Sequence, residues 1–435
     1  MKVHKVNRQL LAILMALTLI LTLFPVGVSA APTTFEDYVV GKLKNFETSF
    51  DITSFAISGR WDGNKAMNMT LDVILGHPEL FYVETSVGVS YTSSSYKITD
   101  INYAFPKTQY AEKKKKYDAA CKAAADTLTD DMTPAEKVLR LHDFLAARTA
   151  YDTSLTKYTS YDALVNGSAV CQGYSLAFSQ LLHNAGIECE IVRSESMNHS
   201  WNYVKLGGKW YHADVTWDDA LYNNSDLLGN VYHSNFLLSD AAIKKTSQPH
   251  KNWLTENALR GKIPAATSTT YDNYYWRDIE TEMWKYGKNW YWAAMDETSP
   301  GVNNNYKSMT ITSAADAAKI YTNLIQGSFS GKKQKSIYRF ESTWFADGTE
   351  GSGKLQWWQE SYTKITLHDG KVYFNTPKLL CAYDIKTGEV TTAGKPKLVN
   401  GQYIYGLTAR GNTLYVTLKS DPGDTDLYKK YELAA

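Results

Sequence analysis

Three residues of this 435-residue chain have the types and the order that thiol chemistry requires. Cys171 lies in the run Ala-Val-Cys-Gln-Gly-Tyr-Ser, His199 lies in Asn-His-Ser-Trp-Asn, and Asp214 lies in Tyr-His-Ala-Asp-Val-Thr-Trp. Attack by a cysteine needs an imidazole that accepts its proton and a carboxylate that holds the imidazole in one tautomer. The three residues therefore predict a nucleophile, a base and an orienting acid.

A helix is expected directly after the cysteine. Between residue 173 and the stop signal Gly186, apolar residues recur at helical spacing along one side of the segment, at Tyr174, Phe178, Leu181 and Leu182. Cys171 would then stand at the helix N-terminus, where backbone N–H groups and the helix dipole favour a thiolate and a developing oxyanion. The local sequence thus predicts an activated thiol.

The histidine and the aspartate are expected on one β-hairpin. Segment 201–215 reads as two strands joined at Gly207-Gly208, because paired glycines supply the positive φ angles that two-residue turns require. In that register His199 and Asp214 share one face of the sheet. A three-residue loop would instead turn Asp214 to the opposite face.

These motifs resemble the transglutaminase-like superfamily, particularly its secreted bacterial branch. The similar stretches occur in the same order and cover less than a third of the chain: 135–145, 161–164, 171–174, 199–202 and 208–219. The resemblance implies an α+β fold with a papain-like core, in which a helix-borne cysteine packs on an antiparallel sheet. It further implies that Cys171 is the nucleophile, His199 the general base and acid, and Asp214 the residue that orients it.

Several residues near the triad have two interpretations. Five of them are candidates for the substrate cleft but can equally pack around the site: Gln172, Tyr174, Trp201, Asn202 and Trp217. Two further histidines, His183 and His212, are expected to be packed rather than functional.

The cysteine count leaves a competing explanation open. The chain has four cysteines, at positions 121, 171, 189 and 381, and disulfides are permitted in an exported protein. A bridge from Cys171 to Cys189 would disable the enzyme, although the alternating pattern around Cys189 makes a core thiol the simpler interpretation. No pair has metal-ligand spacing, so we expect no metal and no cofactor.

Residues 1–30 have the features of a signal peptide. A basic start precedes an apolar stretch at 10–23, and the small residues at 28–30 fit a cleavage site. We therefore expect a secreted or cell-envelope-associated protein without a stable membrane span after cleavage. An uncleaved anchor is the alternative, but the strongly apolar part is short for a bilayer span.

The composition is that of an ordinary folded protein of two or three domains. Hydrophobic residues make up 44% of the chain, charged residues 21%, and the formal net charge is +1, which gives no electrostatic basis for binding nucleic acid. The 31 tyrosines and 12 tryptophans could stack on envelope sugars, but packing is the favoured interpretation.

Three regions are expected after the signal peptide. They are an N-terminal α/β leader region at 31–125, a transglutaminase-like catalytic domain at 126–262 and a β-rich domain at 263–435. In the leader the patterns predict helices at 35–50, 65–75 and 108–128 and strands at 80–84 and 97–103. In the catalytic domain they predict a helix start near Pro134 and a closing strand at 235–240.

The β-rich region contains a loose repeat. Similar short sequence motifs begin at Gly287, Gly370 and Gly411, at spacings typical of propeller blades. Segment 380–388 also resembles the closing strand and turn of a blade. The region is too short for four blades, so we expect an incomplete set of repeats or an open sheet domain.

The triad predicts a thiol acyltransferase acting on a protein or peptide. Cys171 would form a thioester from a carboxamide and pass it to an amine or to water. Two alternatives remain: a cysteine peptidase or amidase acting on envelope or extracellular peptides, and a non-catalytic binding or scaffold protein.

Overall fold

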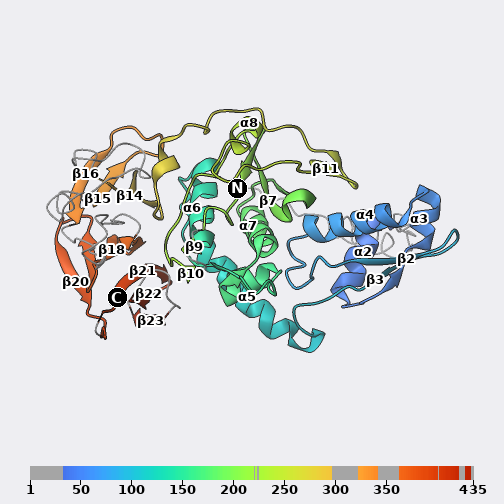
Figure 1. The fold of residues 1–435 in the computed structure, drawn as a ribbon, viewed down its shortest axis with the longest axis horizontal. Helices are drawn as coiled ribbons and strands as arrows, with labels where there is room; N and C mark the ends of the chain where they lie inside the picture. The colour runs from blue at the N-terminus through green and yellow to red at the C-terminus, as the bar shows by residue number, and fades with distance from the viewer. Residues whose placement is uncertain are drawn as a thin grey trace, which may run out of the picture.

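The computed structural model describes residues 33–219, 221–222, 225–295, 322–340, 362–399, 401–420 and 427–432. The predicted signal peptide lies outside this part of the chain. An N-terminal lobe, a central core and a group of C-terminal sheets follow one another across the molecule (Figure 1). Within the described residues, no helix has the length and apolarity needed to cross a bilayer.

The N-terminal lobe packs helices against a small antiparallel sheet. Its elements are α2 (Phe35–Lys44), β1 (Phe50–Asp51), α3 (Thr53–Gly59), α4 (Gly63–Gly76), β2 (Gly88–Tyr91), β3 (Tyr96–Thr99) and α5 (Tyr110–Ala125), with strand order β1-β3-β2. Thr34 and Asp62 cap α2 and α4 by accepting backbone N–H groups of the first turn.

Three sequence predictions for this lobe need correction. The helix predicted to reach residue 50 ends at Lys44. The strand predicted at 97–103 ends at Thr99, because Asp100 adopts a left-handed conformation with φ +59°. Segment 80–84 is a turn with one isolated bridge, from Val83 to Tyr103. Its residues 80–83 are all buried, so they fill the core on every side and do not alternate between two faces.

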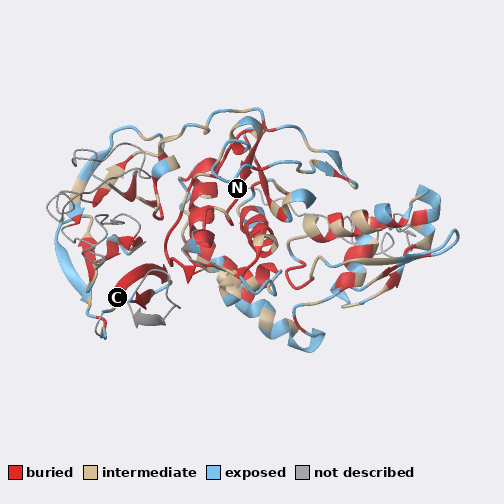
Figure 2. Cartoon of the chain, viewed as in Figure 1, coloured by how far each residue is buried: buried red, intermediate tan, exposed pale blue. Residues whose placement is uncertain are grey.

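The central core places a long helix on a three-stranded sheet. Its main elements are α6 (Pro134–Ala146), β4 (Ala150–Tyr151), the π-helical turn η2 (Asp162–Asn166), β5 (Ser168–Ala169), α7 (Cys171–Asn184), β6 (Cys189–Ser194), β7 (His199–Leu206) and β8 (Lys209–Ala213). The strands run antiparallel in the order β6-β7-β8, and α7 packs on β7. Both helices are mostly buried (Figure 2). The mixed α+β arrangement agrees with the predicted fold class.

Local signals explain where α6 begins. The Thr133 hydroxyl accepts the backbone N–H of Glu136, the Glu136 carboxylate accepts the N–H of Thr133, and Pro134 occupies the first helical position.

Short elements complete the core: β9 (Leu221–Tyr222), β10 (Ser225–Asp226), α8 (Asp240–Ile243), β11 (Glu256–Asn257) and β12 (Gly261–Lys262). The closing strand predicted at 235–240 is reduced to one bridge, in which Leu238 and His212 of β8 exchange backbone hydrogen bonds. Helix α8 starts at Asp240, capped by Ser239, and so ends the extended segment.

The C-terminal residues that the structure describes form three antiparallel sheets. The first holds β13 (Trp284–Tyr286), β14 (Asn289–Met295), β15 (Thr322–Gly327) and β16 (Lys335–Phe340). The second holds β17 (Ile365–His368), β18 (Lys371–Asn375), β19 (Leu380–Asp384) and β20 (Val390–Gly394). The third holds β21 (Tyr403–Arg410), β22 (Thr413–Lys419) and β23 (Leu427–Glu432). In each sheet the strands follow sequence order, as in a propeller blade.

The three recurring motifs occupy equivalent positions in these sheets. Gly287, Gly370 and Gly411 each adopt positive φ in the two-residue turn of the hairpin that starts their sheet. Segment 380–388 was predicted to be the closing strand and turn of a blade. This prediction is wrong in one detail: β19 is the third strand of its sheet, and β20 follows it as the edge strand.

The C-terminal sheets share their packing with the core. One buried apolar cluster extends from Phe35 through the core to Trp292 of β14, and Trp276, Trp290 and Trp292 are almost completely buried within it. The aromatic residues at these positions therefore serve packing.

Candidate active site

Cys171 is the first residue of α7. Its predecessor Val170 is the N-cap but makes no side-chain capping bond, so the first-turn N–H groups are not capped by a side chain. Ser175, one turn into α7, donates to the Cys171 carbonyl and to Ser200 O of β7. This hydroxyl ties the start of the catalytic helix to the strand that carries the histidine.

His199 is the first residue of β7. It follows Asn198, which adopts the left-handed conformation, φ +46°, that asparagine tolerates better than most residues. At the other end of β7, Gly207 and Gly208 have φ of +57° and +77°, and Leu206 pairs with Lys209. The predicted two-residue turn and its register are therefore confirmed.

This register brings Asp214 to the histidine. The His199 Nε2 atom lies 2.6 Å from Asp214 Oδ2. The other carboxylate oxygen, Oδ1, accepts the backbone N–H groups of Thr216 and Trp217 at 3.0 and 3.3 Å. Because Nε2 faces the aspartate, the other ring nitrogen of His199 is left for Cys171, which lines the same groove and whose ionisation is coupled to that of the imidazole. The structure thus places the three predicted residues in the order of a catalytic triad.

The electrostatics of the site favour charge separation between thiol and imidazole. Burial raises the pKa of the Cys171 thiol, but the hydrogen bond and positive charge of His199 outweigh it, so this pKa lies below its ordinary value. Burial lowers the pKa of His199, but the negative charge and hydrogen bond of Asp214 raise it to about 10. Burial also raises the pKa of Asp214, yet His199 and His250 hold it well below the usual range. A thiolate–imidazolium pair is the expected resting state.

A groove of about 260 Å³ leads to the thiol and the imidazole. Of the five predicted cleft residues, only Gln172 lines it. Its lining also includes the apolar Leu155 and Tyr158 and the charged Arg193 and Glu195. Sequence reasoning missed these four residues, because no local pattern shows that the segments around 155 and 193 meet at the cysteine.

The remaining four cleft candidates pack behind the triad. The indole of Trp217 stacks on the His199 ring with centroids 4.5 Å apart, and the buried Trp201 donates from Nε1 to His212 Nδ1. Asn202 donates to the Ser175 carbonyl and to the Cys189 sulfur, and the Tyr174 hydroxyl donates to Asp219. Of the two interpretations, packing describes these four residues. Trp201 and Asn202 are neighbours on β7 and so point to opposite faces, and both faces are covered: Asn202 contacts α7, and Trp201 packs with His212 and Trp253.

His250 joins the site without having been predicted. Its Nε2 lies 2.9 Å from Asp214 Oδ2, the same oxygen that His199 contacts. Its ring lies 4.2 Å from Trp217 and 4.6 Å from Trp201, and its buried Nδ1 has no hydrogen-bond partner. The Nε2 atom is thus the one that donates to the carboxylate. No sequence signal marks His250, which lies 36 residues from Asp214 in a segment without a motif.

All four cysteines are free thiols, so the alternative of a Cys171–Cys189 bridge does not apply. Burial raises the pKa values of Cys121 and Cys189 to about 12 in each case. These thiols stay protonated at neutral pH, which sets Cys171 apart.

A second cavity, of about 690 Å³, is lined by α5 and the turn around Tyr82 in the N-terminal lobe and by α7 in the core. Its lining includes the inert Cys121 together with Tyr117, but no member of the triad. The larger volume is thus separate from the residues equipped for thiol chemistry.

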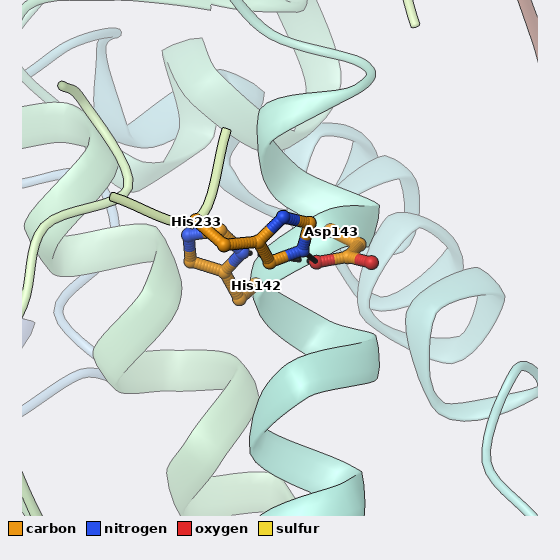
Figure 3. Close-up of side chains that lie close together, drawn as sticks. All are labelled: His142, Asp143 and His233. Carbon is orange, nitrogen blue, oxygen red and sulfur yellow. Dashed lines mark hydrogen bonds and ion pairs between the residues drawn. The ribbon is translucent and has the colours of Figure 1, made fainter. Parts of the chain in front are cut away.

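Another group of titratable side chains lies in the core: His142, Asp143 and His233 (Figure 3). The His142 nitrogens contact Asp143 and Asp218 at 3.0 and 3.2 Å, and the His233 nitrogens contact Ile279 O and Asp143 at 2.9 and 3.1 Å. Every ring nitrogen already has a protein partner. Three such residues could geometrically hold a metal ion, as could His199, Asp214 and His250, but the contacts fit hydrogen-bond networks and we assign no metal to either group.

Comparison with known proteins agrees with this geometry. The family model described as "Transglutaminase-like superfamily" matches residues 122–215. The human kyphoscoliosis peptidase is 24% identical over 152 residues, and the mouse protein of that name 23%. In both cases the match covers 30% of this chain and 23% of the relative, so the chain spans under a quarter of the relatives' length.

Among solved structures, one titled as the crystal structure of a TGase is similar at 13% identity and a TM-score of 0.22, covering 31% of this chain and 44% of that one. The matched residues 122–215 contain Cys171, His199 and Asp214. The chain therefore carries a domain of the transglutaminase-like superfamily.

Proposed function

We propose that the protein is a thiol-dependent acyl-transfer enzyme that acts on carboxamides of proteins or peptides. The observation that carries this proposal is that Cys171 and His199 line one groove and that His199 contacts Asp214 at 2.6 Å, together with a thiol pKa below its ordinary value. Cysteines of this kind are reactive because the thiolate is the nucleophile.

The reaction would proceed through a thioester. The Cys171 thiolate attacks the carboxamide carbon, and the carbonyl electrons move to oxygen. His199 gives its proton to the departing amine as the tetrahedral intermediate collapses. A second nucleophile, activated by the now neutral imidazole, attacks the thioester and regenerates the thiol. Asp214 holds the ring in position and stabilises its cationic form throughout.

Two groups are placed to stabilise the oxyanion. One is the backbone N–H at the start of α7, where the helix dipole is positive. The second is the Gln172 side chain, which lines the groove and whose buried Nε2 has no hydrogen-bond partner. A buried amide without a partner costs free energy, and a substrate oxygen would supply one.

The acceptor of the acyl group divides transferases from hydrolases. An amine acceptor gives an isopeptide cross-link, whereas water gives deamidation or peptide cleavage. The second candidate function, a cysteine peptidase or amidase, is favoured by the relatives named peptidases. Both functions use the same acyl-enzyme on Cys171.

The first experiment measures iodoacetamide labelling of the folded protein near neutral pH by peptide mass mapping. Cys171 should react at least about 100-fold faster than Cys121 and Cys189, because its pKa is lowered and theirs are raised to about 12. His199→Ala should abolish this advantage, whereas the exposed control His183→Ala should retain it. Equal, slow labelling of all three thiols would contradict the proposal and favour a scaffold role.

A second experiment identifies the acceptor. Glutamine-containing peptides are incubated with the enzyme and a fluorescent primary amine, and the masses of the products are measured by mass spectrometry. Amine incorporation that Cys171→Ala abolishes would establish a transferase. Ammonia release or peptide cleavage without incorporation would establish a hydrolase.

We also propose that the protein is exported and acts outside the cytoplasm. The support is the basic start, apolar stretch and small-residue cleavage site within residues 1–30. N-terminal sequencing of the protein recovered from the culture medium or envelope tests this proposal. A cytoplasmic protein that retains Met1 would contradict it.

A further inference from the structure

The loop that precedes the catalytic helix exposes two large apolar side chains beside the nucleophile. Leu155 is 55% exposed and Tyr158 is 37% exposed, and both line the groove that contains Cys171. Single exposed apolar residues are common on protein surfaces. Whether Leu155 and Tyr158 form a binding surface depends on how the loop holds them.

The backbone of Leu155 adopts a conformation that does not suit leucine. Its φ is +55°, in the left-handed region where glycine and asparagine are favoured and a branched apolar residue is strained. Strained residues of this kind persist where the surroundings over-determine them, and they cluster at functional sites. The local backbone alone would favour a different residue, and this strain points to a role for the exposed leucine side chain outside the loop.

Buried hydrogen bonds hold the loop in this shape. The Asp152 carboxylate accepts the backbone N–H groups of Ser154, Thr156 and Lys157 at 3.2, 2.7 and 3.0 Å. Burial raises the pKa of Asp152, but these bonds and those from the Ser154 and Thr156 hydroxyls lower it to about 2. The carboxylate therefore stays ionised near neutral pH and keeps accepting these bonds.

The same loop is fixed to the residues before the nucleophile. Asp152 N–H donates to Ala169 O, and Val170 N–H donates to Lys157 O, at 2.9 Å each. The Tyr158 hydroxyl donates to Leu155 O at 2.7 Å, which orients the ring. Both apolar side chains are thus held in a defined position relative to Cys171.

The groove also has polar lining residues. Arg193, Glu195 and Asn198 are among them, and the last two are exposed. A ligand that contacts both sets of residues needs an apolar part and a part able to form hydrogen bonds. A peptide segment with an apolar side chain has this character, and a volume of about 260 Å³ suits a side chain rather than a folded domain.

We propose that Leu155 and Tyr158 form an apolar subsite that selects substrates with an aliphatic or aromatic side chain next to the reacting carboxamide. This inference rests on the proposed acyl transfer at Cys171. Burial of such a side chain against the two residues would remove apolar surface of both partners from water and so favour these substrates.

The experiment compares matched electrophiles on the full-length protein. Rates of Cys171 alkylation are measured with iodoacetamide, apolar N-benzyliodoacetamide and polar N-(2-carbamoylethyl)iodoacetamide, each divided by its rate with free cysteine. Wild type should prefer the benzyl compound about tenfold over the polar one.

Leu155→Asn is the decisive variant, because asparagine suits φ +55° and the loop should fold at least as well. Together with Tyr158→Asn it should lose most of the benzyl preference, measured within each variant as the rate with the benzyl compound divided by the rate with the polar one. Tyr158→Phe keeps the ring and should keep the preference. The matched control is Ile57→Asn, an exposed apolar residue of the N-terminal lobe, 49% exposed, which should behave as wild type.

The outcomes separate the two proposals. Fast iodoacetamide labelling without a benzyl preference, or a preference that survives in both asparagine variants, would overturn the apolar subsite and leave the proposed function intact. Slow labelling by every compound would overturn the proposed function itself.

Discussion

At the residue scale, three thiols on one chain differ because of their neighbours. Cys121 is buried and Cys189 is half-buried, with the neutral Asn202 amide as its hydrogen-bond donor, and burial raises the pKa values of both thiols to about 12. Cys171 is also largely buried, but it contacts an imidazole that Asp214 keeps protonated. The Asp214 carboxylate, which contacts His199 and not the thiol, therefore determines the reactivity of the Cys171 sulfur.

Substitution of His250 tests whether the surroundings of Asp214 determine the reactivity of Cys171. It is a positioning residue, because it contacts Asp214 and not the thiol. His250→Phe should remove a hydrogen bond to a buried carboxylate, worth about 1.5–3 kcal/mol, and slow Cys171 alkylation about ten- to hundredfold. His250→Gln, which keeps an N–H donor, should recover part of the rate.

The pH profile of alkylation separates positioning from a purely structural role. The hydrogen bond from His250 contributes to the lowered pKa of Asp214, so its loss should raise that pKa and move the acidic limb of the profile to higher pH. A lower rate with an unmoved acidic limb would show that His250 only supports packing.

At the element scale, the start of α7 depends on one glycine. A Cβ at Gly173 would lie 2.6 Å from the Ala169 Cβ and 3.0 Å from Thr159 O. Glycine therefore allows the segment before the nucleophile to pack directly on the first turn of the helix. The Cys-Gln-Gly sequence thus serves packing as well as chemistry.

Gly173→Ala should push the helix start away from this segment. We expect a loss of about 1–3 kcal/mol in the free energy of unfolding, as for other overpacked sites, and slower Cys171 alkylation. Gly41→Ala in α2 is the matched control, since a Cβ there meets nothing within 4 Å. It should stabilise the protein by up to about 1 kcal/mol. Urea unfolding measures both, and equal stabilisation by the two substitutions would refute the packing role.

At the scale of the whole molecule, buried charges connect the catalytic core to the C-terminal sheets. Glu282 accepts hydrogen bonds from Arg140 at 2.6 Å, Arg148 at 3.0 Å and the Thr408 hydroxyl at 2.9 Å. Asp143 accepts the N–H of Met283 at 2.7 Å. Removal of one partner would leave a buried charge uncompensated, so these contacts fix how the parts pack.

The His142 network makes this packing sensitive to alkaline pH. Burial lowers the pKa of His142, but hydrogen bonds to Asp143 and Asp218 raise it to about 9. The folded-state pKa exceeds the unfolded value near 6.5, so the stabilisation is complete below pH 6.5 and is lost as the pH rises through 9. The loss should amount to about 3 kcal/mol at most.

Urea unfolding at pH 6 and pH 9.5 checks this prediction. The difference in unfolding free energy should shrink in His142→Gln and persist in His183→Gln, whose side chain is exposed. A His142→Gln protein with the same alkaline loss as wild type would show that another group titrates in this window.

The sequence by itself determined the features that depend on neighbouring residues. Helical spacing after Cys171 predicted α7, the Gly207-Gly208 turn set the hairpin register, and that register placed Asp214 beside His199. Glycine-containing hairpin turns also revealed the repeat of the C-terminal sheets. Turn chemistry and periodicity act over a few residues and can be read directly.

Only the tertiary structure decided the rest of the site. His250 reaches Asp214, Leu155 and Tyr158 form a groove wall, and Trp201 packs behind the triad because segments distant in sequence meet in the fold. The strand predicted at 80–84 failed for the same reason, since tertiary contacts surround this continuous apolar run and hold it in a turn. Such contacts depend on how the whole chain packs, and no local pattern records them.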